Sequence, residues 1–209
     1  MDRLNTRDRI SFSQGNAIGT IDNAADRIKI NGLVSVFQGD GENKKIIIDR
    51  AHNKWVKNGL RGLLSHFVTK YYFGVYALAA DASRLSIYLG TDNSTSTTHS
   101  LTALVSPIGA SPGTAPSSTN GEGITMISDG HWRIAFSAVF NLGTVSGTVG
   151  EVALYLGMPQ ALVPEGYVDG AFTKVMVSRC AVADGDFAPF TIDPSKSLAI
   201  LWEVFISYE

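Results

Sequence analysis

The sequence predicts a mainly β protein: an antiparallel two-sheet sandwich of jelly-roll type, with one short helix and an extended N-terminal arm. The first observation is the final stretch, residues 198–209, in which apolar and mixed residues alternate. The second is a series of short apolar stretches, from residue 75 onward, that are separated by turn residues and polar loops. About eight strands at this spacing favour two packed sheets.

The final stretch has one continuous apolar face. Residues two apart in a strand share a face, so β-branched and aromatic residues at alternate positions are typical of a half-buried strand. We expect this strand to pair inside a sheet and to pack on a second layer, with Trp202 and Trp132 buried on facing or neighbouring strands. The apolar face consists of Leu198, Ile200, Trp202, Val204, Ile206 and Tyr208, and the mixed face of Ala199, Leu201, Glu203, Phe205 and Ser207.

Residues 1–50 are expected to form an N-terminal arm and a hairpin, outside a sandwich domain of residues 51–209. Residues 1–16 are polar and without periodicity, which is typical of an extended arm, and a short strand is expected at residues 17–22. Apolar residues alternate on both sides of Asn31-Gly32, a dipeptide that accepts the positive φ angles of a two-residue hairpin turn. The sequence therefore predicts a hairpin at this dipeptide.

One short helix is expected near residues 53–68. Its apolar residues fall at spacings that place most of them on one stripe, and Asn53 can cap its N-terminus. Gly59 and Gly62 would each weaken an isolated helix by roughly 1 kcal/mol, so we expect the helix to form only when it packs on the sandwich. The stripe consists of Trp55, Val56, Leu60, Leu63, Leu64 and Phe67.

Three long segments are expected to be loops because they are rich in Gly, Pro and small polar residues. They are residues 91–100, 109–123 and 158–172, and long loops inside a compact domain are usually functional or mobile. The third loop contains the aromatic residues Tyr167 and Phe172, which make it a candidate surface-recognition loop for a glycan.

The candidates for catalysis lack the context that catalysis requires. Gly109-Ala110-Ser111-Pro112-Gly113 fits the spacing of a hydrolase nucleophile elbow, but such an elbow lies between a strand and a helix, and a low-complexity loop follows Ser111. Glu151 and Glu203 lie in or beside expected strands, and nothing in their pattern makes them an acid-base pair. We therefore expect that the protein is not an enzyme and has no catalytic residues.

Metal and cofactor sites are not indicated by the residue spacing. The four histidines are not at the spacings of a metal site. Asp184-Gly185-Asp186 could hold Ca²⁺ only with help from another loop, because it lacks the full ligand series of a calcium loop, and a plain turn explains it as well. We expect no metal and no cofactor. The histidines are His52, His66, His99 and His131.

Charge is sparse and unevenly distributed along the chain. Charged residues make up 17% of the 209 residues, and a charge-poor surface is often covered in an assembly, although an ordinary β-protein composition explains it equally. Residues 1–70 contain 12 Lys or Arg and 7 Asp or Glu, a net charge of +5, whereas residues 71–209 contain 5 and 12, a net charge of −7. Opposite charges suit head-to-tail contact between copies or docking of the basic part on an acidic partner.

Several classes of partner are disfavoured. The basic residues are scattered and form no run, which argues against nucleic acid. No apolar run has membrane-spanning length, so no membrane partner is expected, and the first residues lack the apolar region of a signal peptide. Cys180 is the single cysteine, so an intramolecular disulfide is excluded, and its apolar surroundings predict a buried, inert thiol.

An ordered series of features spans residues 53–209. It begins with the helix start Lys57-Asn58-Gly59-Leu60 and continues with a strand that leads into the polar loop Gly90-Thr91-Asp92-Asn93, then with Ala103-Leu104-Val105-Ser106-Pro107-Ile108. An aromatic strand (132–140), a Glu-led strand (150–155), an Arg-bearing strand (177–182) and a Trp-containing strand (198–204) follow. This order resembles that of small β-sandwich virion structural proteins of tailed bacteriophages, which decorate the capsid or belong to the tail. Residues 1–50 and 158–172 fall outside the resemblance.

The resemblance implies a non-enzymatic virion protein, assembled in the host cytoplasm, that stabilises the shell as a capsid decoration or cement protein. The alternative is a tail, collar or baseplate component, including a glycan- or receptor-binding module. The implied partners are the major capsid protein or tail and collar proteins, together with further copies in a homo-oligomer, expected to be a trimer. Residues 1–16 are expected to dock on such a partner, with Arg3, Arg7 and Arg9 meeting its carboxylates.

Overall fold

The computed structural model describes residues 9–12, 19–22, 28–40, 44–57, 59, 85–159, 167–169 and 172–208. The protein is mainly β, and all pairs of strands in these ranges are antiparallel. Within the same ranges, helical structure is found in the 3-10 helix η3 (Val182–Asp184) and at Lys57 and Gly59. The predicted mainly β, antiparallel class is therefore confirmed.

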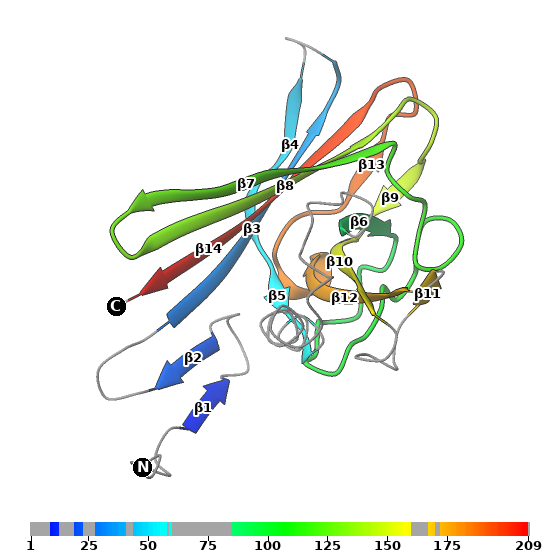
Figure 1. Ribbon diagram of the computed structural model, residues 1–209. Helices are drawn as coiled ribbons and strands as arrows, with labels where there is room; N and C mark the ends of the chain where they lie inside the picture. The colour runs from blue at the N-terminus through cyan, green and yellow to red at the C-terminus, as the bar shows by residue number, and fades with distance from the viewer. Residues whose placement is uncertain are drawn as a thin grey trace, which may run out of the picture.

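The first sheet contains five long strands with the last strand of the chain at its centre. Its order is β4 (Lys45–His52), β3 (Ile28–Gln38), β14 (Leu198–Tyr208), β8 (His131–Phe140) and β7 (Ser118–Ser128) (Figure 1). β14 pairs with β3 and β8 over nearly its whole length. This double pairing holds the C-terminal strand in place.

The second sheet is shorter and lies across from the first (Figure 1). Its order is β11 (Tyr167–Asp169), β12 (Phe172–Ala181), β10 (Glu151–Pro159) and β6 (Leu85–Gly90), and β5 (Lys54–Trp55) also pairs with β12. Two small sheets complete the described strands: β13 (Phe190–Ile192) with β9 (Gly147–Val149), and β1 (Arg9–Phe12) with β2 (Gly19–Asp22).

The two large sheets share one apolar core, so the fold is sandwich-like. The predicted alternation of β14 is confirmed, because Leu198, Ile200, Trp202 and Val204 are buried and Trp202 is 0% exposed. These side chains belong to the same cluster as residues on the inner face of the second sheet. The second sheet contributes Ile87, Leu89, Val152, Leu154, Val175, Val177 and Cys180.

Trp132 does not lie in this core. It sits on β8, beside β14, as expected for neighbouring strands, but its side chain is 42% exposed. Trp132 is at the start of β8, opposite Met126 and Ile206, beyond the point that the second sheet covers. The prediction that it is buried is therefore wrong, because position along the strand decides burial here and alternation does not report it.

The predicted hairpin at Asn31-Gly32 is also wrong, because both residues lie in the middle of β3. Gly32 is opposite Val204 of β14, inside a continuous ladder. A Cβ atom at this position would collide with the side chain of Asn53. Because Gly32 has no side chain, Asn53 can approach β3 closely, and the glycine does not form a turn.

The start of the predicted helix is a strand. Lys54 and Trp55 form β5, which pairs with Arg179 and Ser178 of β12. Asn53 does not cap a helix: its backbone N–H donates to the carbonyl of Gly32 at 3.2 Å, and its side-chain oxygen accepts from Ser178 Oγ at 2.7 Å. Lys57 and Gly59 are helical, as predicted, and residues 58 and 60–68 of the predicted helix lie outside the described residues.

β3 (Ile28–Gln38) and β4 (Lys45–His52) belong to the first sheet, so β4 spans the domain boundary expected between residues 50 and 51. Of the expected arm, residues 9–12 form β1, which pairs with β2 at the expected short strand. Residues 118–123 were expected to be a loop but begin β7, which pairs with β8. Their composition of Ser, Thr, Asn and Gly is typical of loops, and pairing with a strand that is already in the sheet overrides it.

Candidate functional site

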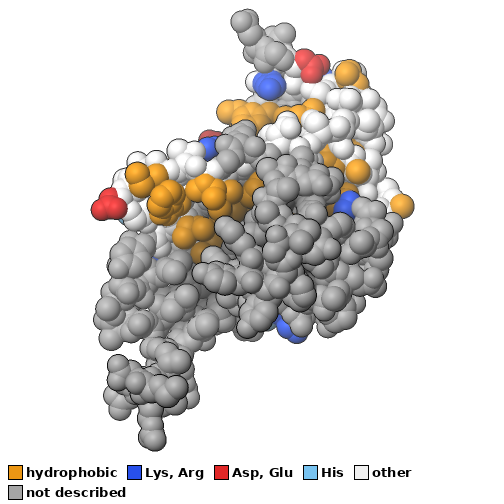
Figure 2. Space-filling model, viewed as in Figure 1, with side chains coloured by type: hydrophobic (Ala, Val, Ile, Leu, Met, Phe, Trp, Pro, Cys, Tyr) orange, Lys and Arg blue, Asp and Glu red, His pale blue; other side chains and the backbone are white. Residues whose placement is uncertain are grey.

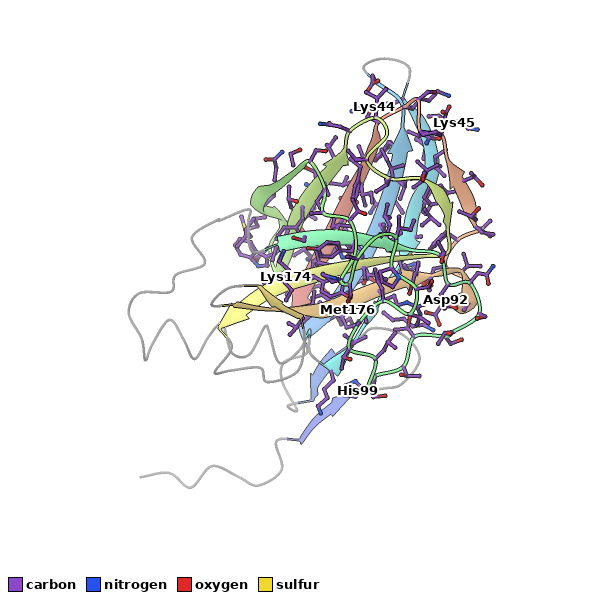
Figure 3. All side chains as sticks on the ribbon, turned by 90° about the vertical axis from the view of Figure 1, so that its right-hand side faces the viewer. Lys44, Lys45, Asp92, His99, Lys174 and Met176 are labelled. Atoms are coloured by element: carbon purple, nitrogen blue, oxygen red, sulfur yellow. The ribbon has the colours of Figure 1, made fainter. Side chains whose placement is uncertain are left out.

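A long loop, residues 91–117, covers the outer face of the second sheet. Backbone bonds tie it down at both ends of its first half: Thr91 N–H donates to Ser106 O at 2.8 Å, and Ile108 N–H donates to Leu89 O at 2.8 Å. Figure 3 shows Asp92 and His99 in this loop, and Lys174 and Met176 on β12 beside it. The loop is therefore a fixed part of the fold over this half.

The loop closes over a buried ion pair. Arg179 on β12 and Glu151 on β10 are both fully buried, and Arg179 Nε donates to Glu151 Oε2 at 2.8 Å. The carboxylate of Glu151 also accepts from the backbone N–H groups of Ser106 at 2.8 Å and Val105 at 3.2 Å. A Cβ atom at Gly90 would collide with this carboxylate, which explains a glycine at the end of β6.

Arg179 also binds the early part of the loop. One terminal nitrogen donates to Thr95 O at 2.8 Å and to Thr97 Oγ1 at 3.0 Å, and the other lies 3.2 Å from Asp92 Oδ2. Burial by itself would raise the pKa of Asp92, but hydrogen bonds from Ser94 and Thr95 outweigh it and lower the pKa below its usual value. Asp92 therefore stays ionised against the guanidinium.

A second ion pair extends the cluster. Lys54 Nζ is 2.8 Å from Asp184 Oδ1, and Asp184 also accepts from Thr97 N–H at 3.0 Å. Burial acts to raise the pKa of Asp184, but Lys54 and Thr97 together lower it. Nearby, burial and the charge of Asp184 raise the pKa of Asp186, which accepts from Ala181 N–H at 2.9 Å. We call Asp92, Glu151, Arg179, Lys54 and Asp184 the ionic clamp.

The polar atoms of the ionic clamp form hydrogen bonds with other groups of the protein. Glu151 accepts from one guanidinium and two backbone N–H groups, and Arg179 donates to two carboxylates, one carbonyl and one hydroxyl. Charge-assisted bonds of this kind are strong and fix geometry. The hydrogen bonds and ion pairs of the ionic clamp therefore hold residues 91–106 on the sheet, and the clamp is a structural feature.

An aromatic layer lies beside the clamp on the same face. The rings of Tyr88 and Tyr155 make an edge-to-face contact with centroids 5.1 Å apart. Tyr155 Oη accepts from Leu104 N–H at 2.9 Å, and burial raises the pKa of Tyr155 to about 12. Lys174 Nζ donates to Tyr88 Oη at 3.0 Å. These contacts anchor the middle of the loop through Leu104.

The first sheet presents an apolar surface that the second sheet leaves exposed. Pairing places Met126, Trp132, Ile206 and Ile30 in one row across β7, β8, β14 and β3. Ile124 and Ile134 form the next row, together with the core residue Val204. Residues that pair directly share a face of the sheet, so this surface continues the core face outward. We call Ile30, Ile124, Met126, Trp132, Ile134 and Ile206 the apolar ledge.

Exposure increases across the ledge from β3 toward the edge strand β7. Ile30 is buried, Ile134 and Ile206 are half-buried, and the exposed fractions of Trp132, Met126 and Ile124 are 42%, 58% and 68%. Figure 2 shows hydrophobic side chains gathered along the β7–β8 hairpin on the face turned to the viewer. Contiguous exposed apolar side chains are typical of surfaces that bind another protein.

The structure does not gather the binding residues expected from the sequence into one place. Arg9 lies on β1, opposite Asp22 of β2, and Arg3 and Arg7 lie outside the described residues. Tyr167 begins β11 and Phe172 begins β12, so the expected third loop is in part a hairpin at one edge of the second sheet. The side chains of these two aromatic residues also lie outside what the structure describes.

The elbow and metal candidates take other roles. Ser111 is exposed in a turn and is followed by an irregular stretch and then by β7, so a strand follows it where an elbow requires a helix. Among the described residues, no three His, Cys, Asp or Glu side chains are grouped so that they could hold a metal ion. Asp184 and Asp186 instead bind Lys54 and Ala181 N–H.

Two features of the site were not predicted from the sequence, although each has a recognisable sequence pattern. Arg179 is a lone charge in an apolar strand and Glu151 leads another such strand, and two such residues on paired strands are a usable sign of a buried ion pair. The ledge is marked by Ile124 and Met126, two apolar residues spaced two apart behind a loop-like stretch. The buried thiol of Cys180 was expected and is confirmed.

Comparisons of the chain with protein-family models, with curated proteins and with solved structures found no match. Within the described ranges, no helix is both long enough and apolar enough to cross a membrane.

Proposed function

We propose that this protein is a non-enzymatic structural protein of the virion of a tailed bacteriophage, and that it acts as a capsid decoration or cement protein through protein–protein contacts. The observation that carries the proposal is the apolar ledge, because contiguous exposed apolar side chains are typical of a surface that a protein partner covers. The ionic clamp supports it, because its buried charges serve to hold a loop on the sheet.

The proposed partners are the major capsid protein or tail and collar proteins, together with further copies of this chain in a homo-oligomer, with a trimer as the form to test first. The arm with Arg3, Arg7 and Arg9 docks on carboxylates of such a partner. The protein acts in the virion after assembly in the host cytoplasm, and it needs no nucleic acid, membrane, metal or cofactor.

The test is to add the purified protein to particles that lack it and to measure binding by co-sedimentation. We expect saturable binding that a deletion of residues 2–16 abolishes and that Met126→Asp weakens. Leu142→Asp is the matched control, because Leu142 is as exposed as Met126 but lies outside the ledge. Absence of binding by the intact protein would refute the proposal. Imaging of the particles would distinguish copies over the whole shell from copies at one vertex.

The alternative role, in the tail, collar or baseplate, includes recognition of a glycan or receptor. The observation that favours it is the β11–β12 hairpin, which brings Tyr167 and Phe172 to one edge of the second sheet. A glycan array on which binding is lost in Tyr167→Ala would support this role. Labelling of Ser111 by a fluorophosphonate probe in stoichiometric amount would instead show an enzyme and contradict both roles.

We also propose that the sandwich is of jelly-roll type. The order of strands supports this, because the chain passes repeatedly between the sheets: β3 and β4 in the first, β5 and β6 in the second, β7 and β8 in the first, β10 to β12 in the second and β14 in the first. The direct pairing of β7 with β8 departs from the simplest jelly-roll order. Experimental tracing of the strand order is the test.

A further inference from the structure

The strand β7 lies at one edge of the first sheet, and its second half is exposed. It pairs with β8, its one neighbour among the described strands. Ile124, Thr125, Met126, Ile127 and Ser128 are all exposed, so both faces of this half of the strand are accessible. An edge strand also presents a row of backbone N–H and C=O groups on the side away from its neighbour, and such a row can bind a further strand.

The opposite edge of the sheet is protected against pairing, whereas β7 is not. The edge strand β4 carries Lys45, Asp49 and Arg50, which are all exposed, and its pairing with β3 is irregular at two places. Charged side chains and bulges are the features by which natural sheets prevent pairing at an edge. Glu122 is the single charged residue among the 11 residues of β7. The pairing of β7 with β8 is regular over residues 123–126, so this stretch is straight enough to receive a strand.

The exposed half of β7 projects beyond the second sheet. Figure 1 shows the end of the β7–β8 hairpin on one side of the molecule and the second sheet on the other side. A second copy whose β7 runs antiparallel to residues 123–127 therefore has its own second sheet at the far end of the overlap. Only the ends of the two hairpins overlap in this arrangement, and the second sheets of the two copies are kept apart.

The sequence of β7 is suited to pairing with a copy of itself. A two-fold axis at Thr125, perpendicular to the sheet, places Thr125 opposite its own counterpart and Ile124 opposite Met126 of the other copy. Threonine pairs and apolar pairs that lie directly opposite each other stabilise a sheet, whereas like charges in that position destabilise it. Glu122 is three residues from the axis, so the two Glu122 residues are not opposite each other.

We propose that β7 pairs antiparallel with β7 of a second copy, about a two-fold axis at Thr125, so that the two five-stranded sheets form one continuous sheet. This deepens the proposed function, on whose homo-oligomer it rests, by naming the contact between copies. The axis keeps both apolar ledges on the same side of the continuous sheet. One pair of copies therefore presents two ledges to a common partner, which favours tight binding through two linked contacts.

A charge exchange at the axis tests the pairing with the purified, full-length chain. We expect the unmodified chain to form dimers in sedimentation velocity at rising concentration. Thr125→Lys and Thr125→Glu should each lose the dimer, because like charges then lie opposite each other, and an equimolar mixture of the two variants should restore it. Thr125 is exposed, so both variants should keep the far-ultraviolet β signal. Ile46→Lys and Ile46→Glu are matched controls at an exposed position of β4, and each should still form dimers.

Disulfide trapping reads the contact directly, even if the chain also associates elsewhere. Cys180 is fully buried, so its thiol does not interfere. Under mild oxidation Thr125→Cys should form a disulfide-linked dimer, because the residue on the axis lies opposite itself, whereas Ile46→Cys should not.

Three results would overturn the inference. They are absence of the Thr125→Cys dimer, dimers that persist in Thr125→Lys, and a mixture of the Lys and Glu variants that remains monomeric. A monomeric unmodified chain whose binding to particles is lost in Thr125→Lys would assign the edge to a strand of the particle, and would also contradict pairing between copies. The dimer assays contain no particle, so their failure is distinct from failure of virion binding.

Discussion

Arg179→Met should strongly destabilise the protein, because it removes one partner of a buried ion pair. Arg179 and Glu151 are both fully buried, and Arg179 Nε lies 2.8 Å from Glu151 Oε2. The substitution therefore leaves the desolvated carboxylate of Glu151 with only the backbone donors of Val105 and Ser106. Removing one member of a buried pair typically costs about 3–5 kcal/mol. We expect a loss of this size in the free energy of unfolding, and Glu151→Leu should cost a similar amount.

The double variant separates the pair from the packing around it. In Arg179→Met/Glu151→Leu the carboxylate of Glu151 is removed together with the guanidinium, and the Asp92 carboxylate loses Arg179 but keeps its hydrogen bonds from Ser94 and Thr95. The total loss should therefore be smaller than the sum of the single losses by about 1–3 kcal/mol. Lys196→Met is a control that removes the exposed ion pair with Asp193 and should cost less than about 1 kcal/mol.

Urea unfolding followed by tryptophan fluorescence measures these differences. Limited proteolysis adds a local readout, because Arg179→Met should make residues 91–106 susceptible to cleavage before the rest of the chain. If Arg179→Met costs less than about 1 kcal/mol, or the two single losses add within about 0.5 kcal/mol, the clamp is not a coupled buried pair and the reasoning is refuted.

Further predictions concern the core and the glycine of β3. Trp202→Ala should lower the free energy of unfolding by about 3–5 kcal/mol, as measured by urea unfolding, because the side chain is fully buried, whereas Trp132→Ala in the isolated chain should cost clearly less. Equal losses would mean that the ledge is part of the core. Gly32→Ala should cost about 1–3 kcal/mol through collision with Asn53, and the same substitution should cost less in an Asn53→Ala background. Absence of this coupling in the unfolding curves would show that another contact constrains Gly32.

The sequence predicted the parts of the fold that depend on local pattern. The alternation in residues 198–208 identified a buried strand and its inner face, since periodicity directly reports which side chains share a face. It could not report how far the second sheet extends, and so it placed the exposed Trp132 in the core. Burial at the end of a strand depends on the facing layer, which is a long-range property.

Turn chemistry failed where a tertiary contact competed with it. Asn31-Gly32 is a strong hairpin dipeptide, but Gly32 lies in β3 because its missing side chain makes room for Asn53. The same contact explains why Asn53 does not begin a helix, since Asn53 forms hydrogen bonds with Gly32 and Ser178. Both errors have one physical origin: two residues 21 positions apart approach each other closely, and local propensity does not record this.

Acid stability provides the last test, because two neighbouring carboxyl groups should act in opposite directions. Lys54 and Thr97 outweigh burial and hold the folded pKa of Asp184 below its ordinary value of 3.8, so the stability that Asp184 contributes is present above pH 3.8 and is lost as pH falls through the folded pKa. Burial and the charge of Asp184 raise the folded pKa of Asp186 above 3.8, so ionised Asp186 opposes folding at higher pH and protonation relieves this. We expect Asp184→Asn to lower the midpoint of thermal unfolding at pH 7, and Asp186→Asn, which can still accept from Ala181 N–H, to raise it. The Asp186→Asn gain should shrink as pH falls toward 3.8, and a gain that is constant with pH would contradict an electrostatic origin.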